Sequence, residues 1–517
     1  MGTSANDRPV VGSWHRQHSK RPYLIGQHGH DLFECERELK MSDLCDKTAV
    51  ELRRLIGRKD ISPVELLESC ITRIEATDGA VNAVVTRAFD RARDEALNAE
   101  KAVLKGNELG LLHGLPLGIK DLEATSGIRT TLGSALYADH IPTKDQGSVA
   151  NIRAEGGIII GKTNTPEFGA GANTRNLVFG ATGNPFDPER TCGGSSGGSA
   201  VALATGMMPL ASGSDYGGSL RTPAGFCGVV GIRPSPGIVA AEGRPVGLLP
   251  FSVLGPMGRN VDDAYLLLQA QMGVDPHDPF STASDMNLFA PLEGADLGSI
   301  RAMITADLGA APMSKSYRSI FAERVDVFSG HFAATLDSNP DFSDGDNSFE
   351  VLRGVNFVAA HGERVRQHRD KLSPNVLDNV DRGLAYNLED VAIAHLQQSK
   401  IARNWLDLFE EVDVVICPAA STSPFPHSQW SVAEIDDAKM ATYMRWLAIT
   451  YLPTMALASA VVLPCGLDDQ KMPFGIQILG APGRDRLVIE VAKALEDVLA
   501  SHPSTMRPIP DLTKLTG

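Results

Sequence analysis

Two short clusters of glycine and serine, separated by an apolar stretch rich in alanine, constrain this chain of 517 residues more than any other feature. The first cluster runs from Gly193 to Ser199, and the second from Asp215 to Arg221. The stretch between them, from Ala200 to Leu210, is expected to form a helix, which would bring both loops to one end of a sheet. Successive backbone N–H groups in such loops can hold an anion or a polarised oxygen. The two clusters together therefore predict a site at one end of a sheet.

The segments around these clusters predict an α/β fold. In residues 110–235, short apolar strands alternate with loops rich in glycine, serine, asparagine and proline, which indicates a mixed sheet whose loops carry function. Ser62-Pro63-Val64-Glu65 is typical of a helix start, because Ser62 and Glu65 can form a capping box. Further helices are expected at residues 87–105, 260–273, 350–412 and 485–500, and further strands at residues 80–85, 157–160, 412–417, 461–463 and 475–479. We expect a large mixed sheet covered by helices on both faces, with helical insertions.

The domain organisation is expected to be simple. Residues 1–40 are polar and form an N-terminal extension, whose four histidines show no metal-ligand spacing. No linker interrupts residues 41–517, so we predict one domain there. Its core would lie at about residues 110–235, with a helical insertion at about residues 300–445.

Composition excludes several classes of protein. The net charge is −15 and no block of Lys and Arg occurs, which argues against nucleic-acid binding. Seven scattered cysteines without a CxxC pair indicate neither a disulfide framework nor a zinc site, and fit reduced thiols in the cytoplasm. No run of eighteen apolar residues or secretory signal is present, so neither a membrane span nor export is expected.

One lysine stands where a buried base is expected. A serine hydroxyl attacks a carbonyl only when a base takes its proton, and lysine can serve when burial lowers its pKa enough to make it neutral. Lys120 lies in Gly118-Ile119-Lys120-Asp121, directly after the apolar run Leu115-Pro116-Leu117. We expect it at the end of a short strand, inside the core. Either Gly/Ser cluster alone is typical of a turn, but the two clusters and this lysine together favour an acyl-transfer site.

These segments carry a resemblance. Residues 110–235 resemble the signature region of the amidase signature family in residues, order and spacing, and the likeness extends more weakly to both ends of the chain. The matching segments are Gly118 to Asp121, Gly161 to Phe168, Gly193 to Ser199, Asp215 to Arg221, Phe226 to Gly231, Leu463 to Gly466 and Pro473 to Gln477.

The resemblance implies a catalytic triad of Lys120 as base, Ser195 as bridging serine and Ser219 as nucleophile, with a cis peptide bond between Gly194 and Ser195. It implies hydrolysis of a carbon–nitrogen acyl bond in a carboxamide, aryl amide or carbamate through an acyl-enzyme, without metal or cofactor. The substrate itself is left open. A homodimer is expected from the habit of the family.

The resemblance also implies supporting roles around the triad. The backbone N–H groups of Tyr216, Gly217 and Gly218 would form the oxyanion hole. Ser196, Asp215 and Arg221 would support the two loops and take no part in the chemistry. Tyr216 departs from the family, which commonly has threonine there, so its ring either reshapes the pocket or packs into the core.

Two other motifs compete with this interpretation. Gly156 to Thr163 fits the phosphate-binding pattern GxxxxGK[ST], but Gly157 to Ile160 favours a buried strand, which cannot wrap a phosphate. Gly193 to Gly197 fits the nucleophile elbow G-x-S-x-G of α/β-hydrolases, which requires a strand directly before it. Residues 184–190 are expected to be loop instead.

Three functional hypotheses remain. The first is a stand-alone amidase. The second is the A subunit of a glutamyl-tRNA amidotransferase, a glutaminase, although Tyr216 and Pro234-Ser235-Pro236-Gly237 depart from its usual pattern. The third is a non-catalytic binding protein, against which the intact Lys120, Ser195 and Ser219 argue. A neutral lysine base predicts a neutral to alkaline pH optimum.

Overall fold

A mixed sheet of eleven strands forms the centre of the computed structural model, which describes residues 44–281 and 286–516. The strand order is β1-β3-β2-β8-β10-β9-β16-β17-β13-β11-β12. These strands are β1 (Val84–Arg87), β2 (Pro116–Lys120), β3 (Ile158–Thr163), β8 (Leu210–Asp215), β9 (Val230–Arg233), β10 (Val253–Gly258), β11 (Arg301–Ile304), β12 (Ala334–Leu336), β13 (Val414–Pro418), β16 (Ser459–Leu467) and β17 (Pro473–Gly480). The predicted extension, residues 1–40, lies outside the described residues.

The sheet combines both strand orientations, as expected. β2 pairs in parallel with β3 and β8, and β11 pairs in parallel with β12 and β13. The other pairs are antiparallel, among them β16 with its two neighbours β9 and β17. Three two-stranded ribbons lie outside this sheet: β4 (Arg175–Asn176) with β5 (Gly180–Ala181), β6 (Gly183–Asn184) with β7 (Asp187–Thr191), and β14 (Glu434–Ile435) with β15 (Ala438–Lys439).

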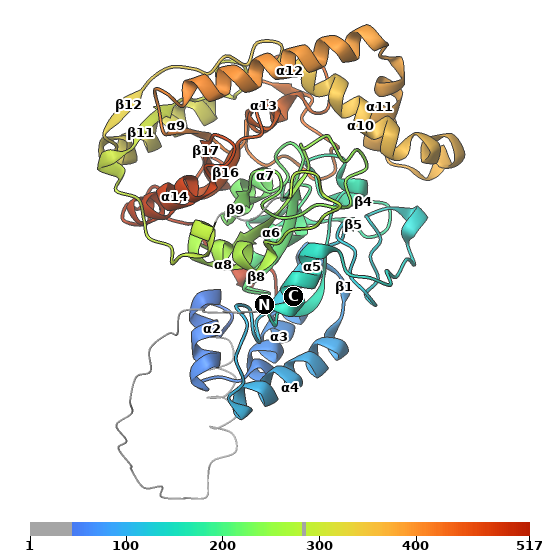
Figure 1. Cartoon of the computed structure of the whole chain (residues 1–517), viewed down its shortest axis with the longest axis vertical. Helices are drawn as coiled ribbons and strands as arrows, with labels where there is room; N and C mark the ends of the chain where they lie inside the picture. Colours follow the sequence, from blue (N-terminus) through green and yellow to red (C-terminus); the bar gives the residue numbers. More distant parts are fainter. Residues whose placement is uncertain (1–43, 282–285, 517) are drawn as a thin grey trace, which may run out of the picture. The chain divides into compact units, whose positions relative to one another are not determined.

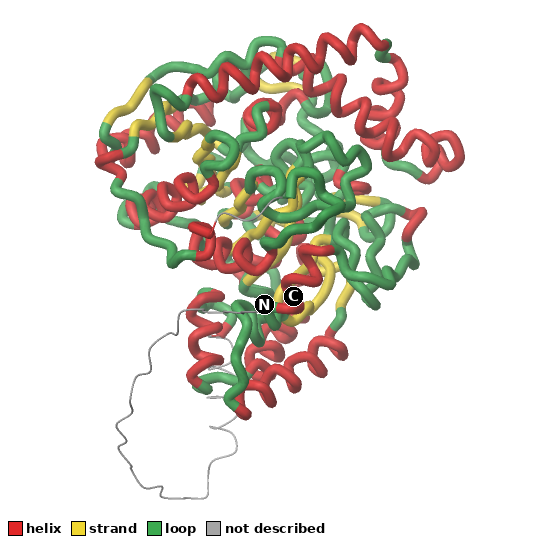
Figure 2. Tube along the Cα trace, in the orientation of Figure 1, coloured by secondary structure: helices red, strands yellow, loops and turns green. Residues whose placement is uncertain are grey.

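Helices surround the sheet (Figures 1 and 2). They are α2 (Ala49–Arg58), α3 (Pro63–Val81), α4 (Phe89–Lys105), α5 (Gly147–Ala154), α6 (Gly197–Ala204), α7 (Arg221–Cys227), α8 (Val261–Gln271), α9 (Lys315–Phe328), α10 (Gly345–His368), α11 (Pro374–Ala385), α12 (Leu388–Leu408), α13 (Ala448–Met455) and α14 (Asp485–Ala500). Figure 1 shows α3 and α4 on one side of the described structure and α10, α11 and α12 together on the opposite side.

Two glycines of β17 show that both faces of the sheet are covered. A Cβ atom at Gly475 would lie 2.7 Å from Gly225 of α7, and one at Gly480 would lie 2.3 Å from Val488 of α14. Because these glycines are five positions apart, their Cβ directions point to opposite faces of the strand. Helices α7 and α14 therefore pack on opposite faces, and the predicted α/β sheet with two covered faces is confirmed.

The start of α3 follows the sequence prediction, but its end does not. Ser62 accepts a hydrogen bond from the Glu65 N–H and the Glu65 side chain accepts one from the Ser62 N–H, so the capping box forms. The helix continues to Val81 and is ended by Asn82 at φ +55°. The strand predicted at residues 80–85 is therefore wrong in its first half, because helix packing wins over the local β-branched pattern.

The stretch between the two Gly/Ser clusters is half helix and half strand. Helix α6 ends at Ala204, and Gly206 at φ +68° turns the chain into β8. The helix predicted over residues 200–210 is thus too long. The two clusters still lie at the same end of the sheet, as predicted. The chain leaves the first cluster along α6 and returns to the second along β8. The Ser196 N–H donates to the Ser219 carbonyl oxygen at 3.2 Å.

The segment at residues 300–445, expected as a helical insertion, is not purely helical. It contributes strands β11, β12 and β13 to the main sheet in addition to helices α9 to α12. The helical region expected over residues 350–412 consists of α10, α11 and α12, since Pro374 begins α11 and Asn387 caps α12.

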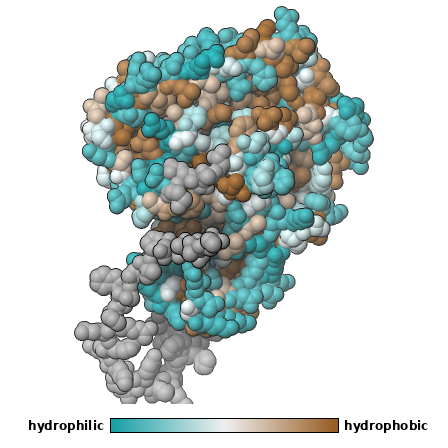
Figure 3. Space-filling view, viewed as in Figure 1, coloured by the Kyte–Doolittle hydropathy of each residue, from teal (hydrophilic) through white to brown (hydrophobic). Residues whose placement is uncertain are grey.

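The surface of the described chain is mixed in character. Hydrophilic and hydrophobic residues are intermingled on the face drawn in Figure 3. Among the described helices, none combines the length and the apolar character needed to cross a bilayer. The six cysteines in the described part are free thiols, all of them buried.

Candidate active site

Lys120 ends strand β2 and is fully buried. Its Nζ lies 2.7 Å from Ser195 Oγ, 2.9 Å from Ser196 Oγ and 2.9 Å from Ser214 Oγ. Burial lowers the pKa of Lys120 to about 7, while the carboxylates of Glu123 and Asp215 oppose this shift. A lysine held among hydroxyl groups can therefore be neutral near neutral pH, when its lone pair accepts a proton.

Ser195 lies between this lysine and the second cluster. The peptide bond between Gly194 and Ser195 is cis, and the Ser195 side chain is 2% exposed. The next residue, Ser196, links the two clusters through its backbone, as described above, and its hydroxyl contacts Lys120. The structure thus brings Lys120, Ser195 and the Ser219 loop together, as the sequence predicted.

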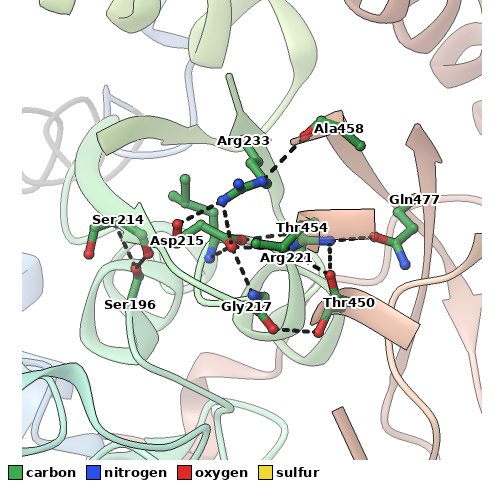
Figure 4. A network of polar contacts seen from close by, with 12 residues as sticks. Ser196, Ser214, Asp215, Gly217, Arg221, Arg233, Thr450, Thr454, Ala458 and Gln477 are labelled. Carbon is green, nitrogen blue, oxygen red and sulfur yellow. Dashed lines mark hydrogen bonds and ion pairs between the residues drawn. The ribbon is translucent and has the colours of Figure 1, made fainter. Parts of the chain in front are cut away.

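Asp215 organises the loop that carries Ser219 (Figure 4). Its carboxylate forms buried ion pairs with Arg221 at 3.0 Å and with Arg233 at 3.1 Å, and it accepts the N–H groups of Gly218 and Leu220. Burial alone would raise the pKa of Asp215, but the two guanidinium groups outweigh it and hold the pKa far below its usual value. Asp215 is therefore ionised and fixes the turn after β8.

One of the three N–H groups predicted for the oxyanion hole already has a protein partner. The Gly218 N–H donates to Asp215 Oδ1 at 2.8 Å, so it is not available to a substrate. In the described part of the chain, the N–H groups of Tyr216, Gly217 and Ser219 have no hydrogen-bond partner. Gly218 serves the turn instead, at φ +127°, where a Cβ would lie 2.3 Å from Thr450 Oγ1.

A small cavity opens beside these N–H groups. Its volume is about 20 Å³, and it is lined by Gly169, Gly171, Ala172, Gly194, Tyr216, Gly217, Gly218, Ser219, Arg353, Met444 and Leu447. Neither Lys120 nor Ser195, which its Nζ contacts, is in this lining, although the neighbouring Gly194 is. The cavity holds roughly one water molecule, so a substrate enters only when the residues that line it rearrange.

The Tyr216 ring takes both of the roles considered for it. It packs edge-on against Phe251 and Phe349, with centroid separations of 5.7 and 6.1 Å, and it also lines the cavity. Burial raises the pKa of Tyr216 well above its usual value, so the phenol is neutral.

The two competing motifs have different outcomes. Strand β3 covers Ile158–Thr163, so the Gly156–Thr163 motif does not form a phosphate-binding loop, as expected. The expectation of loop before Gly193 is wrong, since β7 ends at Thr191. That strand belongs to a two-stranded ribbon outside the main sheet, unlike the strand of a nucleophile elbow.

Sequence reasoning missed several residues that build the site. Arg233 pairs with Asp215, and the Thr450 hydroxyl donates to the Gly217 carbonyl at 2.7 Å. Glu123 accepts the Ser212 hydroxyl, and Ser212 Oγ accepts the Lys120 N–H at 3.0 Å. Arg221 also reaches Gln477 and the Thr454 hydroxyl. Three of these residues lay in or near matching segments: Gln477 ends the segment Pro473 to Gln477, Glu123 follows Gly118 to Asp121, and Arg233 follows Phe226 to Gly231.

The chain matches the Amidase family over residues 65–489. The A subunit of the glutamyl-tRNA(Gln) amidotransferase from Thermosynechococcus vestitus is 32% identical over 481 residues, covering 87% of this chain and 98% of that protein. An acylamidase of Rhodococcus erythropolis is 29% identical over 458 residues, covering 87% and 95%. The crystal structure of a bacterial aryl acylamidase of the amidase signature family superimposes with a TM-score of 0.81 at 27% identity, covering 87% and 96%.

The chain therefore belongs to the amidase signature family, and it is an amide-hydrolysing enzyme. This outcome removes the hypothesis of a non-catalytic binding protein. The relatives include both free amidases and amidotransferase subunits, so family membership alone does not distinguish the other two hypotheses.

Proposed function

We propose that this protein is a stand-alone amidase in which Ser219 is the nucleophile, Ser195 the bridging acid–base and Lys120 the base. The observation that carries the proposal is the 2.7 Å contact between the buried Lys120 Nζ and Ser195 Oγ, behind a cavity that Ser219 lines. A lysine with a pKa lowered to about 7 supplies the neutral amine that this role needs.

The proposed proton relay runs from Ser219 through Ser195 to Lys120. Neutral Lys120 accepts the proton of Ser195, which accepts the proton of Ser219 as that hydroxyl attacks the carbonyl carbon. The carbon–nitrogen bond of the tetrahedral intermediate breaks as the proton returns through Ser195 to the leaving amine. Water then attacks the acyl-enzyme, gives its proton to the same relay, and releases the acid.

Unpaired backbone N–H groups stabilise the negative charge that develops on the carbonyl oxygen of the substrate. The N–H groups of Tyr216, Gly217 and Ser219 face no protein acceptor among the described residues, so they are free to bind the developing oxyanion. Losing one such donor typically lowers kcat by about 10²–10³-fold. Asp215 keeps this turn in place through Gly218 and Leu220.

The A subunit of an amidotransferase is the second candidate, and the relatives of that name, at 32% identity, favour it. Such a subunit would need its partner for good glutaminase activity, whereas a stand-alone amidase hydrolyses simple amides unaided. Tyr216 and Pro234-Ser235-Pro236-Gly237 support the stand-alone enzyme. A cytoplasmic location and a homodimer stay predictions from the sequence.

Intact mass after exposure to a fluorophosphonate tests the nucleophile. Wild type and Ser219→Ala are treated side by side, with Ser195→Ala as a third sample. The proposal expects one adduct on wild type and none on Ser219→Ala. An adduct that persists in Ser219→Ala contradicts it and moves the nucleophile elsewhere, with Ser195 examined first.

A further inference from the structure

Arg353 is a buried cation beside the candidate active site that forms no ion pair with a carboxylate of the described residues. It lies on α10, its side chain is 3% exposed, and it lines the same cavity as Ser219 and Gly217. In the described part of the chain, no carboxylate lies within ion-pair distance of it. Glu350, one turn earlier, accepts a hydrogen bond from Thr442 and forms no ion pair with Arg353, but its charge favours the charged form of Arg353 from a greater distance.

The hydrogen bonds of Arg353 go to neutral oxygens. Nε donates to Asn379 Oδ1 at 2.8 Å, and Nη2 donates to the Tyr443 hydroxyl at 2.9 Å. Aromatic rings surround the guanidinium carbon, which lies 4.5 Å from the Phe357 centroid and 5.3 Å from the Tyr216 centroid. These contacts hold the group in one orientation, but none of them is a direct contact with a negatively charged group.

Arg353 can be compared with three other buried arginines. Among the described residues, Arg259 also forms no ion pair, but it donates to two backbone carbonyl groups and does not line the cavity. Arg221 and Arg233 are just as deeply buried, and each pairs with Asp215. A guanidinium group stays charged at every pH at which proteins function, and burying a charge without a counter-ion is costly. An arginine kept charged and oriented at the wall of a substrate cavity is therefore expected to receive its counter-ion from the ligand.

We propose that Arg353 binds a carboxylate on the substrate, so that the enzyme hydrolyses amides that carry a carboxylate close to the scissile carbonyl. The planar guanidinium fork matches a carboxylate and can bind it through two parallel hydrogen bonds. This inference rests on the proposed function, since it takes the cavity at Ser219 as the place where the amide is bound.

The lining also indicates what the substrate lacks. No acidic side chain is among the described residues that line the cavity. An α-amino acid amide such as glutamine brings an ammonium group along with its carboxylate, and this cavity offers that ammonium no counter-ion. The proposed class is therefore an amide of a dicarboxylic acid, or of an amino acid acylated on its nitrogen, without a free ammonium group.

Protection of Ser219 from a fluorophosphonate tests this proposal. The rate of adduct formation is measured by intact mass against increasing succinate, butyramide and glutamine, for wild type, Arg353→Met and Arg353→Lys. Arg364→Met is the matched control, because Arg364 lies on the same helix and stacks on Tyr137 and Phe168, but is not in the cavity lining. Adduct formation in each variant also reports that its site is folded.

The expected result is protection of wild type and Arg364→Met by succinate at concentrations that leave Arg353→Met unprotected. The concentration for half protection rises roughly 30-fold or more in Arg353→Met and less in Arg353→Lys, while the effect of butyramide is the same in all four proteins. In turnover, wild type prefers succinamate to butyramide, and Arg353→Met loses this preference.

Three results would overturn the proposal: no protection of wild type by succinate, equal protection of Arg353→Met, or better protection by glutamine than by succinate. If the fluorophosphonate fails to label wild type, the proposed function fails instead. The anion site is then measured separately by calorimetric titration of succinate into wild type and Arg353→Met, where heat of binding to wild type alone supports the site and equal or absent heat refutes it.

Discussion

Lys120 and Lys162 are buried to the same extent on neighbouring strands, yet their surroundings differ. Strands β2 and β3 are parallel, and Lys162 pairs in register with Ile119, one position before Lys120. Burial lowers the pKa of Lys120 to about 7 and the pKa of Lys162 to about 8. Nζ of Lys120 contacts three serine hydroxyls, whereas Nζ of Lys162 donates to the Glu123 carbonyl and to Thr125.

Burial lowers the pKa of both lysines, so a low pKa alone does not identify the catalytic base. The groups that contact Nζ determine whether a buried lysine can take part in acid–base chemistry. Lys120 contacts Ser195, whose neighbour Gly194 lines the cavity together with Ser219. The partners of Lys162 belong to the turn after β2, so this lysine ties that turn to β3. Two lysines with similar pKa values are therefore expected to have a catalytic and a structural role, respectively.

Replacing each lysine in turn gives the largest expected effect. Lys120→Met should lower kcat/KM for a simple amide by about 10⁴-fold or more, because the relay loses its base. Lys162→Met should keep kcat/KM within about tenfold but lower the free energy of unfolding by about 1–3 kcal/mol, because it leaves buried acceptors unpaired. Kinetics and urea denaturation of both variants measure this. Equal losses of activity in the two variants would contradict the assignment of a catalytic role to Lys120 and a structural role to Lys162.

The next largest effect is expected at the carboxylate beside Lys120. Asp215→Asn leaves Arg221 and Arg233 buried without a counter-ion and should lower the free energy of unfolding by about 3–5 kcal/mol. The folded-state pKa of Asp215 is depressed, so its contribution is present at neutral pH and is lost as the pH falls through that depressed value. Denaturation of wild type and Asp215→Asn from neutral to acid pH should therefore converge. A constant gap would contradict this account.

A smaller change is expected at Glu123, which faces both lysines. Its charge raises the pKa of Lys120 against the effect of burial, so Glu123→Gln should lower that pKa further and move the acid limb of kcat/KM to lower pH. Activity on the acid side of the profile should increase relative to the plateau. An unchanged limb, or one that moves to higher pH, would show that another group controls it.

The smallest effect concerns one hydroxyl around Lys120. Ser214→Ala removes the 2.9 Å contact with Nζ and should lower kcat/KM by no more than about tenfold, the value of one hydrogen bond. Ser195→Ala, measured in parallel, removes the bridge and should cost about 10²–10⁴-fold. Similar losses in the two variants would mean that Ser195 is only one of several supports.

Local patterns in the sequence predicted the parts of the site that lie within one segment. The strand end at Lys120, the two clusters and the capping box at Ser62 each depend on neighbours a few residues away. The alternating β2, β3 and β8 segments likewise indicated the mixed sheet. The end of α3 was misjudged because tertiary packing continued the helix over residues that are also typical of a strand.

The rest of the site comes from distant segments that no local pattern connects. Thr450 reaches Gly217 across more than two hundred positions, and Arg353 enters the cavity from a helix in the segment expected as an insertion. The hydrogen bond that engages the Gly218 N–H follows from the orientation of one carboxylate, Asp215. Such contacts depend on the assembled fold. The sequence therefore predicted candidate catalytic residues, but not the distant residues that line the substrate pocket.

The pH dependence of Ser219 phosphonylation in wild type tests whether Lys120 is the base that activates Ser219. The second-order rate constant with a fluorophosphonate is measured by intact mass from pH 5 to pH 10, beside Lys120→Met and Lys162→Met. The account predicts a rate that rises with pH through a single inflection near the Lys120 pKa of about 7, persists in Lys162→Met and collapses in Lys120→Met. An inflection that survives the loss of Lys120, or moves with Lys162, would contradict the claim that Lys120 is the base.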